Sequence, residues 1–209
     1  MNKKVGMYSS IITFLAVLSF LLCMVLGLVL QNDDIGKNGS YFSSIFIALG
    51  FVVMVCSYFV YKNNENKIFG LIALSFSIIY AVLIIIVYYT QLTTIRLTNL
   101  SEEISGLLDY SKFGLFFNYN LLGYAFMSLS TFFVGLKLET KNKQENVLKY
   151  LLCIHGIFAI SCFIIPIIGT FNVNMVGGDI IGIIILSFWC LYFMPICILS
   201  YIYFRGKKE

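Results

Sequence analysis

The side chains in this chain that could bind a ligand lie inside long apolar runs. In the run 113–137, polar and small residues recur at spacings of four, four, three and four, at Asn120, Tyr124, Ser128, Thr131 and Gly135. At about 3.6 residues per turn, this spacing places them on one helix face, which we expect to point into a helix bundle. Asn118 and Asn120 could form hydrogen bonds between helices, or they could line a ligand cavity.

His155 is the only histidine in the chain and lies in the run 147–171. A haem or zinc site would need partner ligands at suitable positions, and none accompanies this residue, so we expect no cofactor and no metal. Hydrogen bonding within the bundle and contact with a ligand remain open as its roles. The candidate residues for lining a ligand cavity are therefore Asn118, Asn120, Tyr124, Ser128, Thr131 and His155.

The depth of each residue within its run predicts which of them can meet. Asn120 lies about five residues on one side of the midpoint of its run, and His155 lies about four on the other side. At about 1.5 Å per residue they are roughly 14 Å apart along the bundle axis and cannot touch. At the level of His155 we expect a polar patch of Ser128, Ser130, Thr131, Ser75, Ser77, Cys56 and Ser57. Pro166 predicts a kink later in the same run.

Acidic and basic side chains are missing from the interior of the apolar runs. This argues against a carrier coupled to protons or sodium through a buried carboxylate, and it removes paired carboxylates for acid–base catalysis. A membrane enzyme using His155 and a hydroxyl is the remaining catalytic hypothesis. No nucleophile elbow or phosphate loop supports it, so we expect that the protein is not an enzyme.

Six apolar runs make up most of the chain, and each is long enough for a helix to cross a bilayer core of about 30 Å. Hydrophobic residues form 60% of the 209 residues and charged residues only 11%, whereas soluble domains contain about 25% charged residues. We predict an all-α, polytopic membrane protein with one integral membrane domain over residues 1–209. The expected spans of this antiparallel six-helix bundle are 9–30, 41–61, 68–90, 113–137, 147–171 and 178–204.

Basic residues alternate between the two sides of these predicted spans. Eleven of the 14 Lys and Arg residues fall before the first span, in the second and fourth gaps, or after the last span. Cytoplasmic loops carry the excess of Lys and Arg, so both termini are predicted to be cytoplasmic. The basic edge is expected to meet anionic lipid headgroups, and we expect no nucleic-acid partner. All six cysteines fall in the runs, where they are expected to be small buried hydrophobic residues.

The longest gap lies on the outer side of the predicted bundle. Within 95–109, apolar residues recur at helical spacing, at Leu97, Leu100, Ile104, Leu107 and Leu108. This pattern predicts a short amphipathic helix at the outer interface, or an extension of the third span. The segment could be a cap without a function of its own or a lid over a cavity. A second outer cluster, at Asn172, Asn174 and residues 177–179, is interpreted as a turn and a helix start.

The second half of the chain resembles a family of bacterial and archaeal six-span integral membrane proteins whose function is not established. The resemblance covers roughly residues 88–206 and rests on YTQLTTIRLTNLSEEISGLLDY, NYNLLGYAFMSLSTFFVG and SFWCLYFMPICILSYIYFRG, with Leu122, Gly123, Tyr124, Trp189 and Arg205 in matching positions. The family tends to have an acidic residue before Leu-Gly-Tyr, where this chain has Asn118 and Asn120. The resemblance implies an architecture and location in a prokaryotic cell membrane, without an activity.

Two functional hypotheses follow from these patterns. The first is binding or transport of a lipid or small apolar molecule between the helices, with the outer segment as a gate. It is favoured by the Asn120 stripe and by an aromatic content of 17%. The alternative is a non-catalytic subunit whose apolar faces dock another membrane protein. Membrane lipids are the expected partners in both cases, with a possible membrane-protein partner in the second.

Overall fold

The structure is a computed structural model that describes residues 2–32, 34–60, 67–171 and 178–206. Helices account for nearly all of these residues, and no strand occurs among them. The elements are α1 (Asn2–Leu30), η1 (Asp34–Asn38), α2 (Gly39–Val60), α3 (Lys67–Thr90), η2 (Gln91–Ile95), α4 (Glu102–Leu108), η3 (Tyr110–Lys112), α5 (Leu115–Lys137), α6 (Lys143–His155), α7 (Ile157–Ile167) and α8 (Gly178–Gly206). The outer cluster at 172–177 lies outside the described residues.

Six helical segments are long and apolar enough to cross a membrane. They are Asn2–Leu30, Asp34–Val60, Lys67–Ile95, Leu115–Lys137, Lys143–Ile167 and Ile180–Gly206. Each coincides with one of the six predicted spans, so the all-helical class and the number of span-length helices are confirmed. Such runs form helices because a helix satisfies its backbone hydrogen bonds internally, which an apolar surrounding requires.

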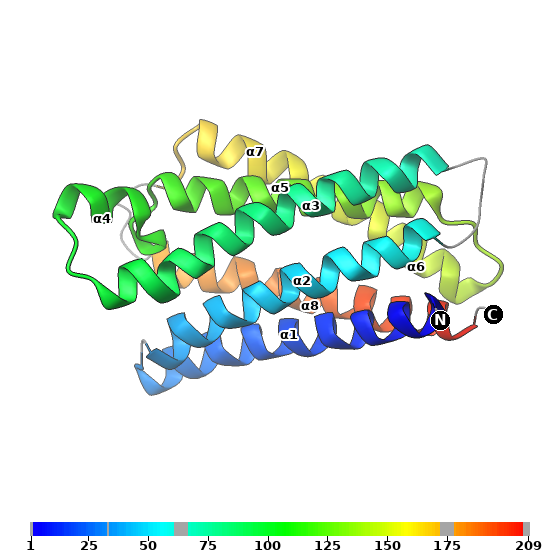
Figure 1. Ribbon diagram of the computed structural model, residues 1–209, viewed down its shortest axis with the longest axis horizontal. Coiled ribbons are helices and arrows are strands. Elements are labelled where there is room, and N and C mark those ends of the chain that lie inside the picture. The colour runs from blue at the N-terminus through cyan, green and yellow to red at the C-terminus, as the bar shows by residue number, and fades with distance from the viewer. Residues whose placement is uncertain (1, 33, 61–66, 172–177, 207–209) are drawn as a thin grey trace.

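The long helices lie side by side along the long axis of the molecule, and both ends of the chain lie at the same end of it (Figure 1). We call this the terminal end and the opposite one the α4 end. α1 packs between α2 and α8, and α3 packs against α2 and α5. α5 also contacts α6 and α7, so the two halves of the chain meet at α3 with α5 as well as at α1 with α8.

Small residues allow α1 and α2 to approach closely. A Cβ atom on Gly27 would lie 2.3 Å from the Cα of Gly36, and one on Gly50 would lie 2.5 Å from Oγ1 of Thr13. The hydroxyls of Ser19 and Ser43 are hydrogen-bonded at 2.9 Å across the same interface. Where lipid removes the hydrophobic drive for helix association, close packing and such bonds hold helices together.

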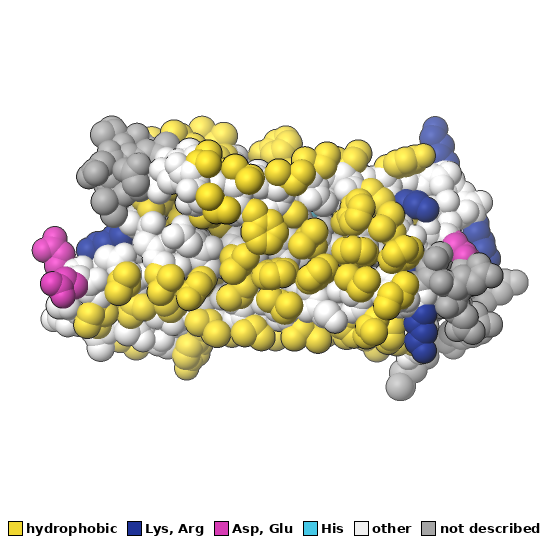
Figure 2. All heavy atoms as spheres, turned by 90° about the horizontal axis from the view of Figure 1, so that it is seen from above, with side chains coloured by type: hydrophobic (Ala, Val, Ile, Leu, Met, Phe, Trp, Pro, Cys, Tyr) yellow, Lys and Arg dark blue, Asp and Glu magenta, His cyan; other side chains and the backbone are white. Residues whose placement is uncertain are grey.

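The surface is apolar along its length and charged at its ends. Figure 2 shows hydrophobic side chains over most of one face, with Lys, Arg, Asp and Glu gathered towards the two ends. Lys137 is an exception in being buried, and its Nζ donates to the carbonyl oxygens of Tyr58 and Phe59 at 2.5 and 2.7 Å. These carbonyls lie in the last described turn of α2, so Lys137 ties this turn to the end of α5.

The α-helical hydrogen-bond pattern of the fifth span is broken at Gly156, ten residues before the predicted kink at Pro166, although the backbone angles of Gly156 stay helical at φ −56° and ψ −25°. α6 ends at His155, and the N–H of Gly156 is bonded to the carbonyl of Cys153 instead of continuing the α-helical pattern. A Cβ on Gly156 would lie 2.9 Å from Cβ of Phe132, so the chain passes very close to α5 here. Pro166 lies in the last turn of α7, where the helix ends one residue later.

The segment 95–109 is only partly helical. The third span continues without a break through η2 to Ile95, and α4 covers seven residues, with Ser101 as its N-cap. No residue of α4 is buried, and Ile104 and Leu107 are exposed. The predicted amphipathic helix is therefore shorter than its sequence pattern, because the extension of α3 takes up the first part of the gap.

Candidate functional site

A cavity of about 630 Å³ occupies the half of the bundle that includes the α4 end. Its walls come from α1, η1, the start of α2, α3, η3, the first half of α5, α7 and the first part of α8. They include Phe20, Met24, Leu28, Lys37, Ser40, Tyr41, Tyr88, Tyr110, Phe113, Phe117, Asn120, Tyr124, Ser128, Phe158, Cys162, Phe171, Leu186 and Trp189. Its volume lies within the range of about 300–1,000 Å³ that is typical of small-molecule sites.

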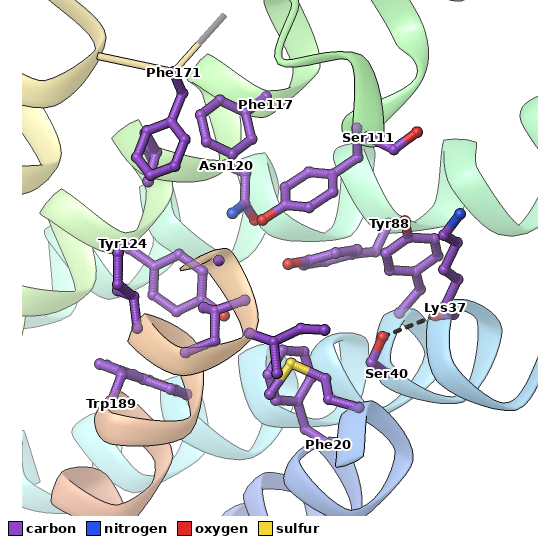
Figure 3. Close-up of a pocket in the computed structure, with 18 of the residues that line it drawn as sticks. Phe20, Lys37, Ser40, Tyr88, Ser111, Phe117, Asn120, Tyr124, Phe171 and Trp189 are labelled. Carbon is purple, nitrogen blue, oxygen red and sulfur yellow. Dashed lines mark hydrogen bonds between the residues drawn. The ribbon is translucent and has the colours of Figure 1, made fainter. Parts of the chain in front are cut away.

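Aromatic rings form much of the wall. Tyr88 and Tyr110 are in ring contact at 6.0 Å, and the ring of Tyr110 also lies 5.3 Å from that of Phe117. On the opposite side, Tyr124 meets Trp189 edge-to-face at 5.1 Å. Phe171 and Phe117 border the cavity beside Asn120 (Figure 3). Such ring pairs hold one another in place, so the cavity has an apolar wall of defined shape.

Asn120 is the polar group that stands out in this apolar surrounding. Its side chain is 1% exposed and points into the cavity (Figure 3). Its Oδ1 has no hydrogen-bond partner. A buried acceptor left without a donor costs about 1–3 kcal/mol, so buried amides are normally paired. The hydroxyl of Ser128, deeper in the same wall, is satisfied by the carbonyl of Tyr124 at 2.9 Å.

Gln91 holds the segment that closes the α4 end of the cavity. Its side chain is 2% exposed. Its Nε2 donates to the carbonyl of Leu108 at 2.7 Å, and its Oε1 accepts from the N–H of Tyr110 at 3.0 Å. The amide thus fixes the end of α4 and η3 to the end of α3, with Tyr110 over the cavity. The sequence analysis did not single out Gln91, although an isolated amide at the end of an apolar run could have indicated a polar contact there.

His155 belongs to a hydrogen-bonded chain below the cavity. Nε1 of Trp189 donates to Nε2 of His155 at 3.1 Å, and Nδ1 of His155 lies 2.8 Å from Oγ1 of Thr131. Oγ1 of Thr131 in turn donates to the carbonyl of Ser128 at 2.8 Å. An indole N–H can only donate, so Nε2 accepts and the ring proton is on Nδ1. Both ring nitrogens are occupied in a neutral, fully paired network.

This network decides what His155 can do chemically. The residue is completely buried, and neither nitrogen has a lone pair or proton directed at the cavity. Among the described residues, no group of three His, Cys, Asp or Glu side chains is placed to hold a metal ion. The contact of His155 with Thr131 agrees with the predicted level of the two residues along the bundle. His155 thus orients Trp189, whose ring lines the cavity.

The polar patch predicted around His155 is only partly present, because Thr131 and Ser128 join its network and other members bond elsewhere. Ser75 is exposed and bonded to the carbonyl of Leu71, and Ser57 is bonded to that of Val53 on its own helix. Ser130 bridges two helices by donating to the carbonyl of Ala73 at 2.7 Å. Ser and Thr in a helix can donate to a carbonyl one turn back in the same helix. Lying at the same depth along the bundle is therefore not enough to bring their hydroxyls into contact.

The six candidate cavity residues separate into three groups. Asn120, Tyr124 and Ser128 line the cavity. Thr131 and His155 lie next to it, and their hydrogen bonds link them to two lining residues, Ser128 and Trp189. Asn118 is exposed and is not part of the wall, because two residues correspond to about 200° around a helix. The expectation that Asn118 lines the cavity is therefore corrected.

Because comparison with known proteins gives no match, the geometry of the cavity is the basis for assigning a function. No protein-family model matches the chain, and no curated protein or solved structure matches it.

Proposed function

We propose that this protein is a multi-pass protein of a prokaryotic cell membrane that binds or transports a lipid or small apolar molecule in the aromatic cavity. The six span-length apolar helices support the membrane location. The prokaryotic origin rests on the resemblance of residues 88–206 to bacterial and archaeal six-span proteins. In this proposal the helices form an antiparallel bundle, and the ligand lies between them.

The charge distribution supports an orientation with both termini in the cytoplasm. Lys3, Lys4 and Arg205 belong to the helix ends at the terminal end, and buried Lys137 lies beside the end of α2. Glu102 and Glu103 begin α4 at the opposite end. Because the cytoplasmic side carries the Lys and Arg excess, the α4 end is the outer one. The cavity then lies in the outer half of the bilayer.

The observation that carries the proposed function is an apolar, aromatic cavity with an unpaired amide in its wall. Ligand sites combine mostly apolar walls with a few convergent polar groups, which is the composition found here. An occupant with a hydrogen-bond donor would remove the cost of the unpaired Oδ1 of Asn120. Close packing would leave no such space in a bundle whose role was purely structural.

The position of the single tryptophan provides a direct test. Trp189 lines the cavity and is only 5% exposed, so its fluorescence reports on cavity occupancy. In lipid nanodiscs, a long-chain probe with a brominated chain should quench Trp189 saturably, and an unbrominated competitor should reverse the quenching. Quenching that rises linearly with probe and never saturates would contradict a binding site.

Two glycines on α8 supply a matched pair of variants. Gly182 lines the cavity, and a Cβ added there meets nothing within 4 Å, so Gly182→Leu fills space without a backbone clash. Gly206 also has open space around it, but it is the last residue of α8 and is not part of the wall. Gly182→Leu should weaken quenching at least about tenfold, and Gly206→Leu should leave it unchanged.

Native mass spectrometry of the protein with its surrounding lipid separates this proposal from the subunit alternative. A retained lipid or apolar molecule that is lost in Gly182→Leu supports the cavity as the binding site. A stoichiometric second polypeptide that is retained equally by Gly182→Leu, with no bound small molecule, would instead support a subunit role. That second outcome would overturn the proposed function.

A further inference from the structure

The break in the hydrogen-bond pattern at Gly156 divides the fifth span into α6 and α7, which have different neighbours. Before the break, α6 packs against both α5 and α8. After it, α7 stays on α5, and its described contacts with α8 are sparse. The ring of Phe158 at the start of α7 still lies 6.4 Å from Phe188 and 5.7 Å from Tyr192 on α8. Towards the α4 end, the two helices are no longer in close contact.

The cavity extends into this space between α7 and α8. Ser161, Cys162 and Ile165 on α7 line it, as do Ile183 and Leu186 on α8. All five side chains are only partly buried, unlike Tyr124 and Asn120 on the α5 wall. The wall is therefore incompletely closed between these two span-length segments, and it is also open at the α4 end, where exposed Gln31, Asn32 and Lys37 line it.

The hydrogen-bonding state of the wall limits the chemistry of the occupant. Asn120 offers an unpaired acceptor, its Oδ1, in a nearly fully buried side chain. The hydroxyls of Ser128 and Ser161 already donate to the carbonyls of Tyr124 and Phe158. A ligand that donates an O–H or N–H bond to Asn120 satisfies the unmet acceptor, and a pure hydrocarbon does not.

We propose that the ligand is a bilayer amphiphile that reaches the cavity sideways, between α7 and α8. Its hydrocarbon chain lies against Phe158, Ile165 and Leu186, and its polar head donates a hydrogen bond to Oδ1 of Asn120. This inference rests on the proposed function and adds the class of ligand and its route. An aqueous route would instead enter at the α4 end, beside exposed Gln31, Asn32 and Lys37, which also line the cavity.

A pair of probes tests the ligand class on the unaltered protein in nanodiscs. One is a brominated long-chain primary alcohol, and the other is its methyl ether, which has the same chain but no donor. Quenching of Trp189 should show that the alcohol binds about tenfold more tightly than the ether, as expected when a buried acceptor gains a donor. In Asn120→Leu the two probes should bind with equal affinity, at the level of the ether.

A pair of α7 variants tests the route. Ser161 lines the gap, whereas Ile160, its neighbour on the same helix, is 65% exposed and lies outside the cavity wall. Ser161→Phe should slow association of the alcohol at least about fivefold, and Ile160→Phe should leave the rate unchanged.

The outcomes separate failure of this inference from failure of the proposed function. If neither probe quenches Trp189 saturably, the cavity is not a binding site and the proposed function fails with it. If both probes bind equally to the unaltered protein, the function stands and the role of Asn120 is refuted. Equal association rates in Ser161→Phe and Ile160→Phe would refute the lateral route alone.

Discussion

The indole nitrogen of Trp189 lies 3.1 Å from Nε2 of His155, and this contact joins the cavity wall to the buried polar network beneath it. Trp189 also stacks on Phe193 at 5.2 Å, so its ring is held by both a hydrogen bond and a flat aromatic contact. The residue that forms the floor of the cavity is thus fixed by α6 as well as by its own helix. Because these aromatic side chains are already held in place, less conformational entropy is lost when a ligand binds.

Replacing Trp189 with Phe should destabilise the protein by about 1–3 kcal/mol, because Nε2 of His155 becomes a buried acceptor without a donor. Unfolding in detergent micelles, followed by circular dichroism, measures this change. The control is Phe188→Leu at a neighbouring side chain that is 59% exposed, where a change within about 0.5 kcal/mol is expected. Equal effects of the two variants would mean that the hydrogen bond contributes nothing to stability.

The proton on His155 should be on Nδ1, because Nε2 accepts from Trp189 and Nδ1 faces Oγ1 of Thr131. Since the chain has one histidine, nitrogen NMR of protein labelled at histidine reports on this residue alone. We expect one protonated and one unprotonated ring nitrogen, the protonated one being Nδ1. In Thr131→Val the Nδ1 resonance should shift strongly. A proton found on Nε2 would contradict the direction of the hydrogen-bonded chain.

Replacing Gln91 with Met should loosen the closure of the cavity, because the carbonyl of Leu108 and the N–H of Tyr110 lose their partner. Backbone hydrogen exchange over residues 108–113 should become at least about tenfold faster. Gln144→Met, the same change at an exposed position on α6, should leave that exchange unaltered. If hydrogen exchange over residues 108–113 in Gln91→Met matches that of the unaltered protein, this segment is held by its aromatic contacts instead.

Replacing Lys137 with Met should destabilise the terminal end, because two carbonyls that end α2 lose a charged donor. Hydrogen bonds to charged groups contribute about 1.5–3 kcal/mol, so unfolding in micelles should show a loss of this size. Lys143→Met removes an exposed charge at the start of α6 and serves as the matched control. A loss no larger than in the control would show that the carbonyls find other partners.

Much of the fold could be predicted because helix formation in apolar surroundings depends on local sequence. The lengths of the six runs defined six span-length helices, and the periodicity of Asn120, Tyr124, Ser128 and Thr131 identified the buried face of α5. Counting residues from the midpoints of two runs also placed His155 level with Thr131, which it contacts. Each of these steps uses only helical rise and rotation, which are nearly constant along a chain.

The contacts between helices were decided only by the tertiary structure. Trp189 as the partner of His155, Gln91 as the clamp on Tyr110 and the break at Gly156 against Phe132 all join residues far apart in sequence. Ser75 and Asn118 were misplaced for the same reason, since the rotation of a helix about its axis is set by packing against its neighbours. The cavity lies where α7 and α8 have few contacts, and such packing between helices is not encoded by the periodicity within one run.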